Sequence, residues 1–442
     1  MTPAPSPHAL IGLSDIDGVI RGKFLDRSKL HSVMQKGGGF CDCVFGWDVD
    51  DQLYDFDGYT GWGTGFPDCK FRVMPDSKRT DPDAGTEYYI GEFCDGQHEF
   101  HPICPRSCLR RVLKRLSNAG FRVRSGFEYE LFVFKESPAS VRTKNYQDLV
   151  PLTPGNFGYS VLRAAAGRDM FEGLLQHCRA WNMPLEGLHC ETGPGVWEAA
   201  LQPSVGLEAA DRANLFKTFS KVYFQPRDAI ATFMAKWSMR YPGQSGHYHF
   251  SLETETGDNQ FVGDSHGLSD IARYALGGLV RYVPEWLPLL APTVNSFTRL
   301  VKGAWAPTAA TWGRENRTCA FRFIPGDNGS QRIENRVPGA DANPYLAASA
   351  TLAAMACGIE QKLEPPEPVI GNAYDLEDAL PSAQRFSPTL RGATSRLRQS
   401  DVAREVFGSE FVDHFVATRL WESEQAERHV NSWQLERYFE SI

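Results

Sequence analysis

The sequence contains no long apolar run and no basic run. None of its apolar stretches approaches the roughly 20 residues that a membrane-spanning helix needs. The formal net charge is −8, with 46 Lys and Arg against 54 Asp and Glu, which disfavours nucleic acid and anionic membranes as partners. The first residues also lack the basic region and apolar core of a signal peptide. We therefore expect a cytoplasmic protein that binds neither nucleic acid nor membrane.

Ten cysteines are present, but they form no disulfide framework. Cys41 and Cys43 are two residues apart, and Cys104 and Cys108 are four apart, which are not zinc-ribbon spacings. We expect free thiols, as in a reducing compartment. The glycine-rich segment 55–65 lacks the Lys and the Ser or Thr of a phosphate-binding P-loop, so we interpret it as a flexible or functional loop.

The 442 residues are enough for two domains, and a change of pattern suggests where they meet. Up to about residue 104, short alternating runs lie between Gly-rich and Asp-rich loops, and strands or hairpins are predicted at 18–25 and 88–93. From residue 105 the apolar periodicity becomes regular. We therefore predict domains at 1–104 and 105–442.

The second of these segments alternates predicted helices and strands. Pro105 begins a helix that Gly120 ends, and an alternating strand follows over 121–134. Asn343 is a predicted N-cap with Pro344 at the first helical position. The other helices are predicted at 208–223, 267–285 and 343–361, and an irregular segment at 364–400.

The stretch from Arg332 to Arg336, with the sequence RIENR, places two guanidinium groups around one carboxylate. On a strand, alternate residues share a face, so Arg332, Glu334 and Arg336 would point the same way. Arginine forks bind carboxylate and phosphate oxygens, and a carboxylate can also ligate a hard cation. By itself the stretch is equally compatible with an exposed ion pair, which is common and weak.

Other potential ligands recur in pairs on predicted strands and turns. The pairs are Glu128 and Glu130, His247 and His249, and Glu191 and Glu198, the last around a Gly-Pro-Gly turn. Crowded carboxylates repel one another unless positive charge lies among them. Five glutamates with one or two histidines suit Mg²⁺ or Mn²⁺ better than zinc. Any one pair taken alone is more often a solvated face.

Taken in order, these motifs resemble the glutamine synthetase superfamily over nearly the whole chain. The matching pieces are FEYE at 127–130, the Glu pair at 191 and 198, GHYH at 246–249, NSFTRLV at 295–301, NRT at 316–318, RFIP at 322–325 and RIENR at 332–336. The resemblance implies an α+β fold, with a small N-terminal β-grasp domain and a large catalytic α/β domain built on a curved antiparallel sheet. It also implies six-membered rings, often stacked in pairs, with active sites between neighbouring subunits.

The resemblance implies ATP, L-glutamate and an amine as substrates, with two or three Mg²⁺ or Mn²⁺ ions per site. One ion would bind Glu130, Glu191 and Glu198, and a second would bind Glu128, His247 and Glu334. His249 and Ser251 would meet the nucleotide, and Arg317, Arg322 and Arg332 would face the transferring phosphoryl group. Arg299, Arg336 and Gly243 would bind glutamate.

The amine end departs from the ammonia-using enzymes. Their loop carries a glutamate six residues past the arginine that matches Arg299, whereas this chain has Trp305. Tryptophan cannot accept a proton. Their Asp-Gly-Ser-Ser motif reads Asp57-Gly58-Tyr59-Thr60 here, followed by Trp62, with Asp55 as a competing alignment for Asp57. An aromatic pocket favours an amine with a hydrocarbon body, so we predict a ligase of glutamate and a bulky or aromatic monoamine.

Three alternatives remain at this point. The chain could be a glutamine synthetase whose base lies elsewhere, or a γ-glutamyl-polyamine synthetase in which a second ammonium lies over the tryptophan. A non-catalytic member of the superfamily is disfavoured because all six candidate metal ligands are present. Tyr374 lies near the tyrosine that some bacterial glutamine synthetases modify, but its flanking sequence differs, and we expect a packed or simply exposed side chain.

Overall fold

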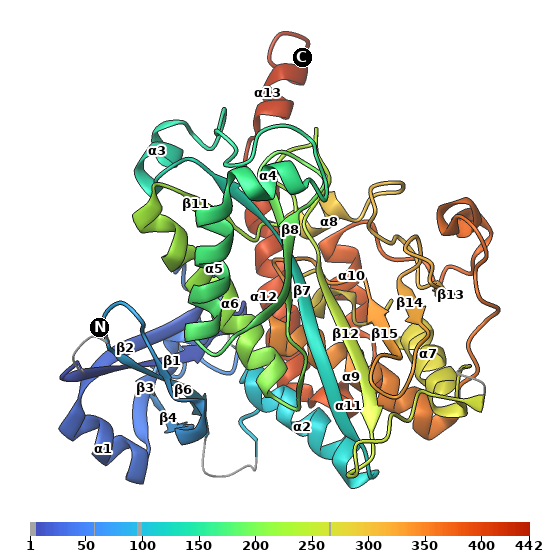
Figure 1. The fold of residues 1–442 in the computed structure, drawn as a ribbon, viewed down its shortest axis with the longest axis horizontal. Helices are drawn as coiled ribbons and strands as arrows, with labels where there is room; N and C mark the ends of the chain where they lie inside the picture. Colours follow the sequence, from blue (N-terminus) through green and yellow to red (C-terminus); the bar gives the residue numbers. More distant parts are fainter. Residues whose placement is uncertain (1–5, 57, 95–99, 265–266) are drawn as a thin grey trace.

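The computed structural model describes residues 6–56, 58–94, 100–264 and 267–442, which fold around two β-sheets (Figure 1). The N-terminal sheet has the strand order β2-β1-β6-β4-β3, with β5 beside β6 and β1 parallel to β6. Its elements are β1 (His8–Ser14), β2 (Ile20–Asp26), α1 (Arg27–Lys36), β3 (Gly38–Cys41), β4 (Asp68–Val73), β5 (Arg79–Thr80) and β6 (Glu87–Phe93). The hairpin of β1 and β2 and the strand β6 confirm the predictions at 18–25 and 88–93.

The larger sheet has the order β13-β14-β15-β12-β7-β9-β8, with β10 and β11 also pairing with β7. Its strands are β7 (Arg122–Phe134), β8 (Leu185–Cys190), β9 (Val196–Leu201), β10 (Ser204–Val205), β11 (Ile230–Thr232), β12 (Gly246–Glu253), β13 (Trp312–Arg314), β14 (Phe321–Ile324) and β15 (Arg332–Asn335). All pairings in this curved sheet are antiparallel except that of β13 with β14. The α+β class predicted from the sequence is confirmed.

After the N-terminal sheet, the helices are interspersed with the strands of the larger sheet along the chain. They are α2 (Pro105–Asn118), α3 (Pro138–Thr143), α4 (Val161–Ala166), α5 (Arg168–Ala180), α6 (Glu208–Phe224), α7 (Asp270–Tyr282), α8 (Val294–Arg299), α9 (Pro344–Gln361), α10 (Leu390–Arg398), α11 (Asp401–Phe407), α12 (Ser409–Glu427) and α13 (Ser432–Tyr438). Short 3₁₀ helices lie at Asp42–Phe45, Pro75–Ser77, Gln225–Arg227, Leu287–Leu289 and Ala373–Ala379. Within the described ranges, no helix is both long and apolar enough to cross a bilayer.

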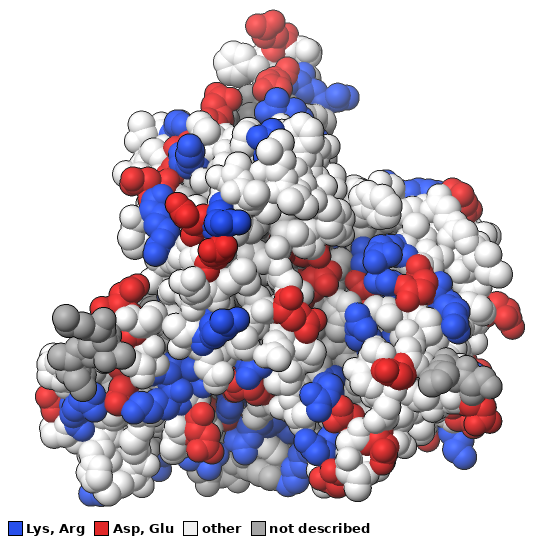
Figure 2. Space-filling model, viewed as in Figure 1, with Lys and Arg blue, Asp and Glu red and all other residues white. Residues whose placement is uncertain are grey.

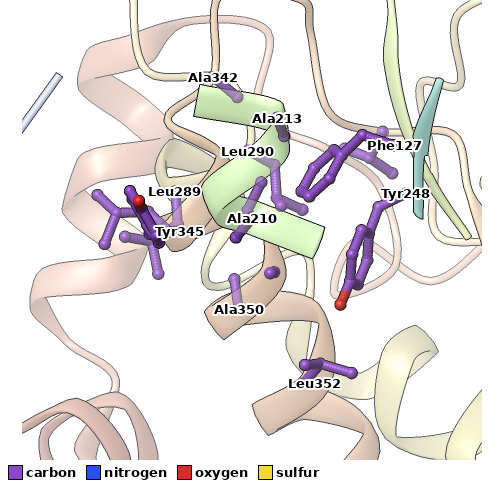
Figure 3. Packing of buried hydrophobic residues seen from close by; sticks show 14 of the residues in the cluster. Phe127, Ala210, Ala213, Tyr248, Leu289, Leu290, Ala342, Tyr345, Ala350 and Leu352 are labelled. Atoms are coloured by element: carbon purple, nitrogen blue, oxygen red, sulfur yellow. The ribbon is translucent and has the colours of Figure 1, made fainter. Parts of the chain in front are cut away.

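The core lies between one face of the larger sheet and the central helix α9. Asn343 caps α9 and Pro344 begins it, as predicted, and the helix is buried on all sides against α2, α6 and α7. Figure 3 shows Tyr345 of α9 near residues of α6, and Phe127 of β7 beside Tyr248 of β12. Because strand side chains alternate, burying these rings turns their neighbours to the opposite face of the sheet.

The prediction of an irregular segment at 364–400 is wrong in part. The segment contains the 3₁₀ helix Ala373–Ala379 and the whole of α10. Thr389 caps α10 by accepting from the Gly392 N–H, and Leu390, Ala393 and Leu397 are buried at helical spacing. This short apolar stripe is stable because it packs on α12, a contact that the local sequence does not reveal.

A buried ionic network joins the N-terminal sheet to the helices α2, α6 and α9. Arg106 of α2 donates through Nε to Asp211 Oδ1 of α6 (2.9 Å) and also pairs with Glu92 of β6. The hydroxyl of Tyr345 donates to the same Asp211 oxygen (2.7 Å). Removing one partner of such a network leaves an uncompensated buried charge.

We expect Arg106→Ala to destabilise the protein strongly. Loss of the buried guanidinium should cost about 3–5 kcal/mol, because Glu92 and Asp211 remain buried without it. The matched control is Arg115→Ala, since Arg115 pairs with a Glu360 whose side chain is 44% exposed, and such pairs are worth about 1 kcal/mol or less. The urea midpoint of each variant measures the difference, and equal midpoints would contradict the expectation.

Candidate active site

The candidate functional side chains form a row across one face of the larger sheet, and the register of the strands sets this row. His189 of β8 pairs with Glu198 of β9, which pairs with Glu130 of β7. On the other side of β7, Glu128 pairs with His247 of β12.

The row then continues to the far edge of the sheet. His249 pairs with Glu334 of β15, which pairs with Arg322 of β14. Paired residues on neighbouring strands lie side by side on one face. Six strands thus bring together residues that are more than 190 positions apart in the sequence.

Two adjoining cavities lie over this row. The larger has a volume of about 630 Å³ and the smaller about 220 Å³, and both are lined by Glu128, His249 and Arg332. Ser251 lines the smaller cavity, whereas Gly243 and Trp305 line the larger. Figure 2 shows acidic side chains near the centre of this face, over β7 and β8, with basic side chains beside them towards β14.

Glu334 is the central carboxylate of the row and is only 1% exposed. Its oxygens accept from Arg336 (Nη1–Oε1, 2.5 Å) and Arg322 (Nη1–Oε2, 3.1 Å). Burial raises its pKa, but Arg336, His249 and His247 outweigh burial and lower that pKa to about 2. The exposed ion pair that the isolated RIENR stretch allowed is therefore absent, and the three charged residues share one face as predicted.

The two histidines face Glu334 with different chemistry. His247 Nδ1 lies 3.3 Å from Glu334 Oε1 and 3.4 Å from Glu128 Oε1. Arg332 Nε donates to His249 Nδ1 (3.2 Å). A neutral imidazole has one acceptor nitrogen, so this bond leaves the hydrogen of His249 on Nε2. The ligand atoms that lie within 4.8 Å of one another are those of Glu128, His249 and Glu334, and His247 Nδ1 lies close to the same two carboxylates.

Besides Glu334, four carboxylates line the larger cavity, from Glu128 and Glu130 of β7, Glu191 after β8, and Glu198 of β9. Burial, followed by the charges of Glu128, Glu130 and Glu191, raises the pKa of Glu198 to about 10. Such a group favours cations among its oxygens. An oxygen-rich donor set with one imidazole fits Mg²⁺ or Mn²⁺.

We expect Glu198→Gln to weaken metal binding without harming the metal-free protein. The change removes one ligand, and because a pKa of about 10 leaves Glu198 protonated and neutral at pH 7 without metal, the Tm without metal should stay within about 1–2 °C of wild type. Saturating Mg²⁺ or Mn²⁺ should stabilise wild type by about 2–4 kcal/mol and the variant by less than about half of that. Thermal melts with and without EDTA measure both.

Glu172→Gln is the matched control for this variant, because the Glu172 side chain is 59% exposed on α5. The control should respond to metal as wild type does. An equal metal response in the Glu198 variant would show that Glu198 is not a ligand.

Further arginines line the larger cavity. Arg299, at the end of α8, is buried and donates to the Val337 and Arg336 carbonyls (2.9 and 3.1 Å). Burial lowers its pKa to about 10. Gly243 allows this packing, because an added Cβ would lie 2.7 Å from Arg299 Cγ. Arg317 is exposed on the cavity wall.

The Nε atom of Arg336 has no hydrogen-bond partner among the described residues, although it is buried. Arg322 is held between two carboxylates, since its Nε also donates to Glu315 (3.0 Å). Arg336 therefore offers an unpaired N–H donor, whereas the charge of Arg322 is already neutralised by two carboxylates.

The structure places the predicted amine-end residues in two different regions. Trp305 lines the larger cavity and is 60% exposed, with a left-handed backbone (φ 59°). Tyr59 lies instead beside His101 (hydroxyl to Nε2, 3.2 Å), and Trp62 is 72% exposed and packs edge-on against Phe66. Both are outside the two cavities of their own chain. Asp57 lies outside the described residues.

Three residues in or beside the cavities were missed by sequence reasoning. His189 Nε2 lies 3.2 Å from Glu191 Oε2 and 3.5 Å from Glu198 Oε1, and its spacing of two from Glu191 was the available signal. Tyr159 stacks on the His189 ring (4.4 Å between centroids, 13°), from a loop without a pattern. Glu186 lines the smaller cavity, where burial raises its pKa. Simple strand alternation does not predict the direction of the Glu186 side chain, because the strand register shifts between Leu185 and Gly187.

Residues 102–438 match the family described as glutamine synthetase, catalytic domain, so the chain belongs to the glutamine synthetase family. The ligand-free structure of GmaS superposes with a TM-score of 0.84 at 25% identity, covering 98% of this chain and 97% of that one.

Among characterised relatives, the chain is 44% identical to type-1 glutamine synthetase 2 of Dictyostelium discoideum, over 99% of this chain and 84% of the relative. It is 33% identical to the glutamate–isopropylamine ligase of a Pseudomonas species, over 98% and 95%. It is 34% identical to a γ-glutamylethanolamide synthetase of Streptomyces coelicolor, over 98% and 95%. The relatives therefore include both ammonia-type and amine-type ligases, and they confirm the resemblance to the amine-ligase branch.

Proposed function

We propose that this chain is an ATP-dependent ligase that joins the γ-carboxylate of L-glutamate to an organic amine through γ-glutamyl phosphate. Its preferred amine is a bulky or aromatic monoamine. The observation that carries the proposal is Trp305 in the wall of the cavity that also holds the carboxylates and arginines. The isopropylamine and ethanolamide relatives support the general reaction.

In this proposal, each of the two cavities binds a different substrate. The nucleotide occupies the smaller cavity beside Ser251, with its phosphates towards His249 and Arg332, which line both cavities. Glutamate occupies the larger cavity, where Arg336 and Arg299 hold its carboxylates. The unpartnered Nε of Arg336 is a donor available for this contact.

The transferring group carries negative charge that the chain itself must offset. Arg317 and Arg322 would donate to the phosphoryl oxygens as they move towards the glutamate carboxylate. Mg²⁺ or Mn²⁺ held by Glu130, Glu191 and Glu198, and by Glu128, His247 and Glu334, would supply the positive charge that lets two anions approach. Arg332 keeps His249 in the tautomer that donates from Nε2.

The amine end is apolar where the ammonia enzymes are acidic. Tyr159, Pro242, Ala304 and Trp305 line the larger cavity together with Val196. Such a wall excludes water from an alkyl or aryl group and gives a hydrated ammonium ion little compensation for its lost hydration.

We also propose hexameric rings, in which residues 58–62 of a neighbouring subunit lie over the amine end, because Tyr59 and Trp62 lie outside the cavities of their own chain. We likewise propose domains at 1–104 and 105–442, and a cytoplasmic location.

The test is ATP- and glutamate-dependent phosphate release with Mg²⁺ or Mn²⁺. The amines should span ammonium, methylamine, longer alkylamines, phenyl-bearing amines, putrescine and spermidine. We expect bulky monoamines to exceed ammonium in kcat/KM by at least about tenfold, which corresponds to about 1.4 kcal/mol. Product mass identifies the γ-glutamyl amide.

The second candidate is glutamine synthetase, which the 44% identity to a protein of that name favours. It predicts ammonium as the best substrate and would mean that the base lies outside the Trp305 loop. Polyamines as the best substrates would instead place a second ammonium over the aromatic wall.

A further inference from the structure

The loop from Leu300 to Thr308 carries Trp305 in a conformation that needs support. Val301 to Gly303 are exposed, and both Gly303 (φ 79°) and Trp305 (φ 59°) have left-handed backbones. A bulky residue in that region costs about 1–3 kcal/mol and persists only when its surroundings hold it. The contacts that hold this loop therefore decide where the indole lies.

One segment, residues 369–379, contacts the loop at three points. The Tyr374 hydroxyl donates to the Ala306 carbonyl (3.1 Å), directly after Trp305. The Thr308 hydroxyl donates to Glu377 (2.7 Å), and Lys302 lies 3.9 Å from Asp378 at the surface. The first contact is the strongest constraint, because Tyr374 is only 9% exposed and Ala306 is buried.

The same segment also holds the loop that carries Arg317. The Asn316 side chain donates to the carbonyls of Val369 (3.2 Å) and Gly371 (2.8 Å), and the Ala373 N–H donates to the Thr318 hydroxyl (2.9 Å). Segment 369–379 therefore ties the loop at the amine end to the loop at the phosphoryl end. The buried Tyr374 hydroxyl already has a partner, so the phenol is a packed side chain and not an accessible modification site.

We infer that Tyr374 is a positioning residue, which fixes Trp305 through the Ala306 carbonyl and so sets the fit of the amine. The effect on loop mobility stands by itself, whereas the effect on amine selectivity rests on the proposed function. Losing one buried hydrogen bond of this kind should change a local equilibrium by about three- to tenfold.

The test compares Tyr374→Phe with Tyr223→Phe in the full-length protein. Tyr223 is the matched control, because its buried hydroxyl also donates to a backbone carbonyl (Met170, 2.9 Å) but lines neither cavity. Trypsin under native conditions should cleave after the exposed Lys302 about three- to tenfold faster in Tyr374→Phe and at the wild-type rate in the control. Mass spectrometry of the fragments identifies the site.

The kinetic measurement uses the best amine of the panel. Tyr374→Phe should raise the KM for that amine by about three- to tenfold, with the KM for ATP within about twofold of wild type. Thr308→Val, which removes a second contact of the same loop, should act in the same direction if Tyr374→Phe does not fold.

Unchanged cleavage after Lys302 in the variants that fold would overturn the inference. Faster cleavage with an unchanged amine KM would overturn its link to selectivity. If wild type uses no amine better than ammonium, the proposed function fails, and the cleavage result still decides whether Tyr374 positions the loop.

Discussion

Replacing Trp305 by glutamate is expected to shift the preference of the enzyme towards ammonium by about 10²–10³-fold in the ratio of kcat/KM values. The variant removes an aromatic wall, worth about 1–2 kcal/mol to a bulky amine. It also adds a carboxylate that can bind ammonium and accept its proton. Each 1.4 kcal/mol is a factor of ten in this ratio. The backbone strain is matched, since both side chains must adopt the left-handed conformation at this position.

Two further variants separate these contributions. Trp305→Phe keeps an aromatic face and should retain the preference for bulky amines, whereas Trp305→Ala should weaken their use without improving ammonium. Steady-state rates with ammonium and with the best amine measure all three. An unchanged ratio in the glutamate variant would show that the loop does not select the amine.

Glu334→Gln is expected to lower kcat/KM by about 10²–10³-fold, the loss typical when one preorganised electrostatic group is removed. Glutamine has nearly the same shape, but it removes the negative charge between Arg322 and Arg336 and one proposed metal ligand. The arginines would then repel each other and the cation. Turnover at saturating Mg²⁺, together with a thermal melt that confirms folding, measures this effect.

Glu315→Gln is the matched control, because it is the same substitution at another carboxylate that pairs with Arg322. The Glu315 side chain is 46% exposed and lines neither cavity. Its effect should be less than about tenfold, since exposed pairs contribute little. A Glu334 variant as active as this control would remove Glu334 from the proposed machinery.

The local sequence pattern was sufficient to predict side-chain direction within a strand, because successive side chains point to opposite faces. The alternation of Phe127 and Tyr129 with Glu128 and Glu130 predicted both a buried face and a functional face, and β7 has both. The cap at Asn343 and the proline after it predicted the start of α9 for an equally local reason. Helix α10 was missed because its stability comes from packing on α12.

The candidate site shows the limit of this reasoning. The sequence identified Glu128, Glu198 and Glu334 as possible ligands only as separate pairs and through family resemblance. It gave no distance between them, and it missed His189 and Tyr159. Their positions depend on pairing between strands distant in the chain and on a loop without periodicity.

The sequence by itself determined which side chains share a face, which family the chain resembles, and that the amine-end loop carries tryptophan in place of glutamate. Only the tertiary structure decided that the strands order as β15-β12-β7-β9-β8, so that carboxylates, histidines and arginines meet over one pair of cavities. It also decided that Tyr374 reaches the loop of Trp305. The physical reason is that side-chain direction follows from local backbone geometry, whereas register and loop position follow from hydrogen bonds and burial between distant segments.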